Sequence, residues 1–143
     1  MDSVLIRLHK TLRDRRRGDA LVEFVLLAPT LLLVLFGVFE VGRIVDAWLI
    51  VQNAAREGAR AGSVAYPDSA VAGAAQTAAT SYLSMAGLST RGDVTGIVVK
   101  APLVTGDAVQ VTAEADVKIY TPLIRTLLPA TVPVKGTAAM RRQ

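Results

Sequence analysis

The sequence predicts an α+β fold: a long N-terminal helix that crosses a membrane and continues outside it, a second helix, and a small antiparallel sheet of about three strands packed on the long helix. Three observations predict this fold. An apolar stretch of membrane length occupies residues 20–39, an amphipathic helical pattern follows over residues 41–65, and alternating apolar and polar residues appear after residue 94. At 143 residues, the chain has room for one domain beside its membrane element.

The first 18 residues form a basic leader (residues 1–18). They contain six basic and two acidic residues, whereas the rest of the chain contains ten of each. The sequence pI of 9.9 therefore reflects the leader, and the charge gives no reason to expect a nucleic-acid partner. Positive charge at one end of an apolar segment predicts that this end stays in the cytoplasm. We expect a single-pass protein of the cytoplasmic (inner) membrane, with its N-terminus inside and its C-terminal domain outside.

The apolar stretch Ala20–Phe39 is 20 residues long, and Glu23 is its only charge. About 20 apolar residues cross a bilayer as a helix. Pro29 removes one backbone hydrogen bond and favours a kink or a loosened turn, which membrane helices tolerate when neighbouring groups satisfy the freed carbonyl. A secretory signal peptide is the alternative, but its apolar region is typically about 7–15 residues and its small-residue cleavage site follows that region. Here the suitable small residue precedes the stretch, so we predict a retained helix in membrane lipid.

The helical pattern then becomes amphipathic over residues 41–65. The helix, 19–65 in all, should end near Ala65, because a proline two residues later disfavours helical backbone in the residue before it. Ala54, Gly58 and Gly62 form a stripe of small residues with four-residue spacing. Inside a membrane such a stripe suggests helix dimerisation. Outside it, we expect the chain's own sheet to pack there.

Residues 66–143 predict a small α+β domain outside the membrane. Asp68 and Ser69 can cap a second helix, which Gly87 closes. This helix is predicted over Ala70–Met85. Its core-facing side is expected to carry Val71, Ala75, Ala78, Tyr82 and Met85.

Three strands and a short helical turn complete the predicted domain. Pro133 lies in the last strand and predicts an edge position or an irregular start, since proline cannot donate a ladder hydrogen bond. A sheet of this size makes a thin core, so it should need the long helix as its second layer. The strands are predicted at 94–100, 108–119 and 132–140, and the turn at 122–128.

Residues suited to catalysis are scarce. The one histidine, His9, lies in the leader, and there are no cysteines, so the sequence predicts no catalytic residue, no metal site and no cofactor. The tripeptide 91–93 (Arg-Gly-Asp) matches an integrin-ligand motif, but three residues match easily by chance. The sequence does not predict an enzyme. Four acidic residues of the outer domain are expected in turns or on a solvent face: Asp93, Asp107, Glu114 and Asp116.

Several spaced motifs carry a family resemblance. The run 18–24 (Gly-Asp-Ala-Leu-Val-Glu-Phe) resembles the processing site of type IV pilin-like proteins, with Gly18 before the cleaved bond, Glu23 at mature position five and an aromatic, Phe24, next. The sequence that follows is similar to the TadE-like pseudopilins of tight-adherence (Flp) pilus systems. The similar segments are Leu-Leu-Ala-Pro (26–29), Phe-Glu-Val-Gly-Arg (39–43) and residues 52–60. This resemblance covers about residues 15–62.

The resemblance implies cleavage between Gly18 and Asp19 by a prepilin peptidase, a membrane aspartyl protease. It also implies assembly with other pilin-like subunits on an inner-membrane assembly platform, and a final location in the inner membrane or in an extracellular filament. Major pilins of this type are usually much shorter than the mature chain expected here, which favours a minor or accessory subunit.

Cleavage would create an amine on Asp19, one helical turn from Glu23. The Glu23 carboxylate could neutralise its own amine or that of a neighbouring subunit. The second arrangement would fix the register between subunits, since an unpaired buried carboxylate is strongly destabilising. The alternative for Glu23 is a passive position at the headgroup level. The alternative for the whole chain is an uncleaved single-pass anchor whose outer domain binds an envelope partner.

Overall fold

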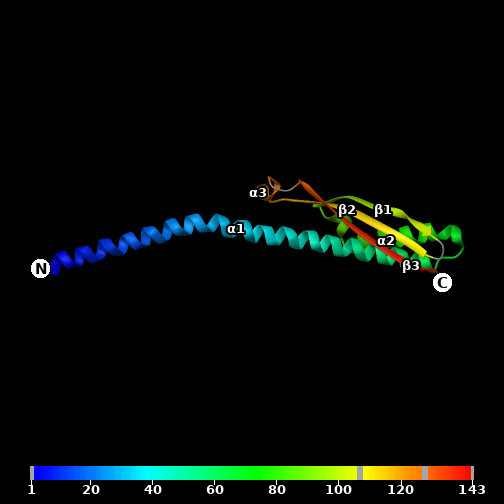
Figure 1. Cartoon of the computed structure of the whole chain (residues 1–143), viewed down its shortest axis with the longest axis horizontal. Helices are drawn as coiled ribbons and strands as arrows, with labels where there is room; N and C mark the ends of the chain where they lie inside the picture. Colours follow the sequence, from blue (N-terminus) through cyan, green and yellow to red (C-terminus); the bar gives the residue numbers. More distant parts are fainter. Residues whose placement is uncertain (1, 106–107, 127–128, 143) are drawn as a thin grey trace. The chain divides into compact units, whose positions relative to one another are not determined.

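The structure is a computed structural model that describes residues 2–105, 108–126 and 129–142, with side chains described at 19–100, 108–122, 125–126 and 129–142. It has an α+β fold, which confirms the predicted class (Figure 1). The chain divides into two compact units. We call residues 1–38 unit 1 and residues 39–143 unit 2.

Helix α1 runs over Asp2–Ser63, through Pro29. It therefore contains the leader and ends two residues before the predicted end at Ala65. The Ser63 hydroxyl donates a hydrogen bond to the Arg60 carbonyl oxygen in the last turn (2.8 Å). Because α1 crosses from unit 1 into unit 2, its second half belongs to unit 2.

The sheet is antiparallel with the order β1-β2-β3. Its strands are β1 (Val94–Thr105), β2 (Ala108–Lys118) and β3 (Thr131–Arg141). The odd-numbered residues of β2 from Val109 to Val117 are buried and the even-numbered ones are partly or fully exposed, as the alternating sequence predicts. Strand β3 is an edge strand, which confirms the position predicted from Pro133.

The second half of α1 and helix α2 (Val71–Met85) cover one face of the sheet, making two layers (Figure 1). Most of the core residues of the two helices are small, so the helices can lie close to the strands. The α1 side contributes Ala47, Val51, Ala54, Ala55 and Ala59, and the sheet contributes Val94, Val109, Val111, Ala113, Ala115, Val117 and Val134.

The small-residue stripe of α1 lies inside this core. Ala54, Gly58 and Gly62 are all buried. A Cβ atom added to Gly58 would lie 2.8 Å from the Ala75 carbonyl oxygen and 3.2 Å from Val111 Cγ1. The stripe is therefore covered by α2 as well as by β2.

Helix α2 differs from its prediction in two respects. The predicted cap by Asp68 or Ser69 is wrong: these residues form a 3₁₀ turn, η1 (Asp68–Ala70), and the residue at the N-cap, Ala70, has no capping side-chain bond. Asp68 instead pairs with Arg142, the residue that follows β3. The predicted core side is wrong beyond Ala75. The buried residues are Val71, Ala75, Ala79 and Leu83, whereas Met85 is 83% exposed.

Two short segments connect the helices and strands. Gly87 ends α2 with φ of 71°, as predicted, and precedes a second 3₁₀ turn, η2 (Leu88–Thr90). After β2, the predicted turn appears as helix α3 (Pro122–Arg125). The remaining part of that prediction, residues 127–128, lies outside the described residues.

Candidate functional site

The residues predicted for processing and assembly lie in unit 1. Gly18 is in α1 but just outside the residues with described side chains, and His9 is also outside them. Asp19 and Glu23 are exposed, and Phe24 is 67% exposed. The side chains of Glu23 and Phe24 therefore lie on the surface of the helix, where lipid or a neighbouring molecule can reach them.

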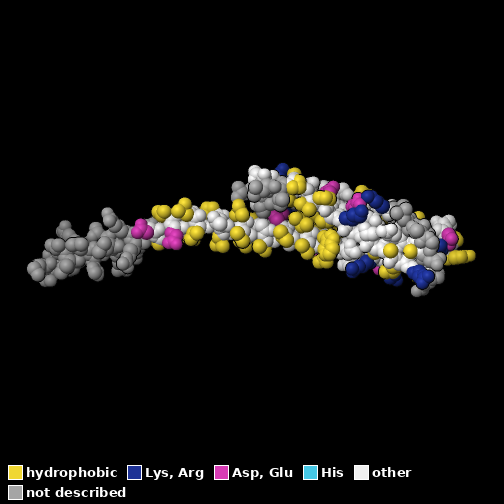
Figure 2. Space-filling model, in the orientation of Figure 1, with side chains coloured by type: hydrophobic (Ala, Val, Ile, Leu, Met, Phe, Trp, Pro, Cys, Tyr) yellow, Lys and Arg dark blue, Asp and Glu magenta, His cyan; other side chains and the backbone are white. Residues whose placement is uncertain are grey.

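The segment that follows is apolar on its surface. Large apolar side chains between residues 21 and 39 are exposed, and Figure 2 shows them along the visible face of the helix after the grey leader. Among the described residues, one helix is long and apolar enough to cross a membrane, and this segment is its apolar part. Pro29 is exposed there and does not interrupt the helix.

A buried carboxylate marks the first turn of α1 in unit 2. Glu40 is 4% exposed. Its Oε1 atom accepts hydrogen bonds from the backbone N–H groups of Tyr120 (2.8 Å) and Thr121 (2.9 Å), and from the Thr121 hydroxyl (3.1 Å). Its Oε2 atom accepts a hydrogen bond from Arg43 Nη1, one turn further along α1. Glu40 thus attaches the segment that follows β2 to the helix.

Arg43 extends this contact to two other segments. Its Nη2 atom donates to Asp93 Oδ2 (2.7 Å) and to the Lys118 carbonyl oxygen (3.1 Å), and its Nε atom donates to the same Asp93 oxygen (3.2 Å). The guanidinium group also lies 4.7 Å from the centre of the Tyr120 ring, a cation–π distance. One arginine therefore holds the start of β1 and the end of β2 against α1.

Asp93 lies in a turn, as predicted, but it is buried, so the expectation that it is exposed to solvent is wrong. It is 8% exposed and accepts hydrogen bonds from both Arg43 and Arg91, and Arg91 also pairs with Asp46 of α1. Hydrogen bonds from the Arg91 guanidinium, and to a lesser extent from Arg43, lower the pKa of Asp93 to about 2. Burial alone would raise this pKa, but its effect is smaller than that of the two arginines. The fold brings this turn over α1, a contact that the local sequence does not reveal.

The other predicted acidic residues behave differently. Glu114 and Asp116 are partly exposed on the open face of β2, as predicted, and Glu114 pairs with Lys100 (2.8 Å). Asp107 lies outside the described residues.

A second polar contact joins α1 to the edge strand. The Gln52 side chain donates to the Thr137 carbonyl oxygen (3.1 Å) and accepts from the Thr137 N–H (3.3 Å). Beside it, Gly136 lies so close to α1 that an added Cβ atom would be 2.6 Å from Gln52 Cα and 2.7 Å from the Val51 carbonyl oxygen. Only glycine permits this approach without displacement of the strand.

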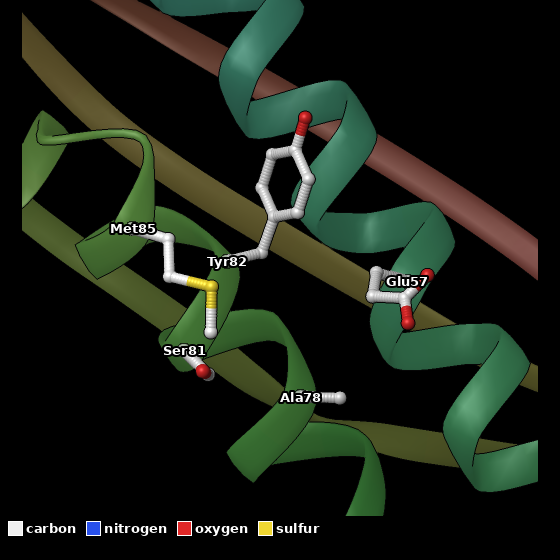
Figure 3. Close-up of a pocket in the computed structure, with 5 residues that line it drawn as sticks. All are labelled: Glu57, Ala78, Ser81, Tyr82 and Met85. Atoms are coloured by element: carbon white, nitrogen blue, oxygen red, sulfur yellow. The ribbon is translucent and has the colours of Figure 1, made fainter.

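A shallow hollow opens between α1 and α2. It has a volume of about 270 Å³ and is lined by Glu57 of α1 and by Ala78, Ser81, Tyr82 and Met85 of α2 (Figure 3). Glu57 pairs with Arg60 on the surface (2.6 Å). Among the described side chains, every buried nitrogen and oxygen atom has a hydrogen-bond partner, and no three His, Cys, Asp or Glu residues are grouped as metal ligands.

The sequence prediction missed the roles of Glu40 and Arg43. A signal was present: Glu40 follows directly on the apolar stretch, and Arg43 is three residues later, the spacing of neighbours on one helix face. The spacing could have predicted the Glu40–Arg43 pair. It could not have predicted the partners on β1 and β2, because those depend on the tertiary fold.

The comparisons with known proteins agree with one of the sequence interpretations. A family model described as TadE-like protein matches residues 18–60. This match confirms the family resemblance over the apolar segment and most of the second half of α1, including Glu40 and Arg43. The search of curated proteins gave no match, and the search of solved structures gave none.

Proposed function

From the TadE-like match over residues 18–60, we propose that this chain is a pilin-like structural or accessory subunit of a tight-adherence (type IV) pilus assembly. The observation that carries the proposal is the extent of the match. It begins at Gly18, the predicted cleavage position, and ends within the part of α1 that forms the core of unit 2. One continuous segment therefore contains the processing site, the membrane anchor and the support of the outer domain.

The proposed location is the inner membrane, with the leader in the cytoplasm and unit 2 outside. The exposed apolar segment 21–39 and the basic residues before it support this topology. On this view the chain is a single-pass anchor before assembly, and its partners there are membrane lipid and the inner-membrane assembly platform. After assembly it becomes part of an extracellular filament.

Processing after Gly18 requires a prepilin peptidase that reaches the cytoplasmic end of the membrane segment. Gly18 supplies a small residue at the scissile bond, and the basic leader keeps that bond at the membrane surface. Cleavage of the Gly18–Asp19 bond by water leaves a carboxylate on the leader and an amine on Asp19. The departing leader takes with it the excess positive charge of the chain.

We assign Glu23 the role of partner to this amine. Glu23 is exposed on α1, one helical turn from Asp19, and the side chains around it are apolar. In a filament core of low dielectric, the Glu23 carboxylate of one subunit would pair with the amine of another. A pair of this kind fixes the axial register, because any other register leaves both charges buried without partners.

An exposed apolar face of α1 in unit 2 supports assembly with other pilin-like subunits. The sheet and α2 cover one side of the helix, but four apolar residues on its other side are exposed. They recur at steps of three and four, so they form one face. These residues are Val41, Val45, Trp48 and Leu49.

The assembly role is tested with Glu23→Ala and Glu23→Gln, and with Glu57→Gln as the matched control on an exposed part of the same helix. We expect all three variants to be cleaved, since recognition depends on Gly18 and the leader. Both Glu23 variants should be lost from sheared filaments or from cross-linked complexes with other pilins, whereas Glu57→Gln should be retained. Wild-type recovery of both Glu23 variants would favour a passive residue and the uncleaved-anchor function.

A further inference from the structure

We propose that Gln52 is an edge cap: its side chain occupies the outer edge of β3, the side that faces away from β2, and prevents a second copy of this chain from adding its own strand there. Every residue involved lies in unit 2, so the edge cap would operate whether or not the chain assembles into a pilus. With this edge closed, contacts between copies are left to other surfaces, such as the exposed apolar face of α1.

The hydrogen bonds of β3 reveal which of its backbone groups face outward. The strand lies at one edge of the sheet and pairs with β2 in one continuous antiparallel register (Figure 1). In such a ladder, residues alternate between those bonded to the partner strand and those that face away from it. Thr137 faces away, because its N–H and its carbonyl oxygen both bond to the Gln52 side chain. The odd-numbered residues of β3 therefore present their backbone groups along the outer edge.

Two positions on this edge cannot bond to an added strand. Pro133 is an outward position by the same alternation, and proline has no N–H to donate. At Thr137, the Gln52 amide already occupies both the donor and the acceptor, with distances of 3.3 and 3.1 Å. Lys135 lies alone between these two positions. Beyond them, only the short end of the strand from Ala139 to Arg141 stays open.

Removal of the Gln52 amide would open a much longer stretch. The residues Lys135, Ala139 and Arg141 are exposed, and within the described parts of the chain their outward backbone groups have no hydrogen-bond partner. If Thr137 were free as well, the open edge would extend over residues 135–141, which is longer than the average strand of about 5–6 residues. An exposed edge of this length is a template for pairing with another strand. One side chain therefore decides whether the edge is usable.

The same edge of a second copy is the partner that fits best. Two β3 strands related by a two-fold axis run antiparallel, so their outward N–H and carbonyl groups face one another in a self-complementary contact. Lys135 and Arg141 give both edges positive charge, which opposes this pairing and is screened by salt. In salt, the edge cap is thus the barrier that a substitution can isolate.

The test uses the full chain in detergent, with micelles in excess over protein and about 0.5 M sodium chloride to screen exposed charges. Gln52→Ala and Gln52→Met both remove the amide, and methionine keeps the length of the side chain. The matched control is Val111→Ala, because Val111 is fully buried in the core, so its truncation lowers stability without changing the edge. Ala139→Pro, combined with each Gln52 variant, removes another outward N–H and should block the edge again.

The fraction of dimer is measured by light scattering. We expect the wild type and Val111→Ala to give the same fraction, and both Gln52 variants to give a several-fold larger one. Addition of Ala139→Pro should return this fraction to that of the wild type. Amide hydrogen exchange should locate the contact, because the N–H groups of Lys135 and Thr137 should exchange about tenfold more slowly in the dimer.

Gln52 variants that fold and are no more dimeric than the wild type would overturn the edge cap. An equal gain of dimer in Val111→Ala would assign the association to lost stability and would overturn it too. Dimer that persists after Ala139→Pro is added would place the contact on another surface, with the same consequence. If Gln52→Ala does not fold, the result with Gln52→Met decides.

Discussion

Gly136→Ala tests how closely the edge strand approaches the long helix. A methyl group at this position would lie 2.6 Å from Gln52 Cα, 2.7 Å from Gln52 N and 2.7 Å from the Val51 carbonyl oxygen. All three are backbone atoms of a regular helix, so none can rotate away as a side chain would. An ordinary contact needs about 3.4–4 Å. Strand β3 must therefore move away from α1 by about 1 Å.

The displacement of β3 should lower the free energy of unfolding by an amount that can be estimated. Overpacking a well-packed core typically costs about 1–3 kcal/mol, and we expect the upper part of this range. The movement also stretches the two hydrogen bonds between Gln52 and Thr137, which are already 3.1 and 3.3 Å long. The matched control is Gly73→Ala in α2, where an added Cβ atom meets nothing within 4 Å. There alanine should stabilise the helix by about 0.5–1 kcal/mol.

The assay is urea unfolding of the full chain in detergent micelles, followed by the emission of the one tryptophan, Trp48, which lies in unit 2. The free energy of unfolding should fall for Gly136→Ala and rise slightly for Gly73→Ala, with unchanged urea dependence for both. If Gly136→Ala is as stable as the wild type, the strand does not lie as close to the helix as the structure has it.

Two further predictions concern the ionic contacts of unit 2. The pKa of Asp93 is lowered from 3.8 to about 2 in the folded state. Its ionised carboxylate therefore contributes about 2 kcal/mol to the free energy of unfolding above pH 4, and this contribution is lost as the pH falls from about 4 to 2. Unfolding measured across this pH range should show the loss, and in Asp93→Asn this pH dependence should be absent. Glu40→Ala leaves the N–H groups of Tyr120 and Thr121 without an acceptor and should lower the free energy of unfolding in urea by about 3 kcal/mol or more. Glu40→Gln keeps one acceptor oxygen and should lower it by less. Equal losses would mean that the lost ion pair with Arg43, and not these N–H groups, accounts for the effect.

The elements of the fold were predictable where one local pattern decides the outcome. The alternating residues of β2 predict its buried face, Gly87 predicts the end of α2, and Pro133 predicts an edge strand. Each of these signals depends on the chemistry of a few adjacent residues, and no distant contact competes with it.

The errors arose where tertiary contacts decide. In α2, alanine-rich sequence gives a weak amphipathic pattern, so the choice between Ala78 and Ala79 as core residues depends on where the helix meets Gly58. Asp68 could have capped α2, but Arg142, 74 residues later, is its partner. Asp93 resembled a solvated turn residue because Arg43, its partner on α1, is 50 residues away.

The candidate site divides in the same way. The positions of Gly18 and Glu23 were predicted from a sequence motif, and the TadE-like match covers both. The roles given to them depend on a peptidase and on neighbouring subunits, and they stay predictions. The sequence could have predicted the pair of Glu40 with Arg43, but not the contact of Glu40 with Tyr120 or that of Gly136 with α1, because those partners lie on other segments.

The measurement that tests the central claim most directly is the N-terminal mass of the chain purified from the membranes and filaments of its native host, with Gly18→Leu as the comparison. We predict that the wild-type chain begins at Asp19, and that Gly18→Leu remains as a precursor that begins at or near Met1, because a bulky side chain blocks the scissile position. A wild-type chain that keeps its leader in filament-producing cells would contradict the proposed function, and so would a normal mature product from Gly18→Leu.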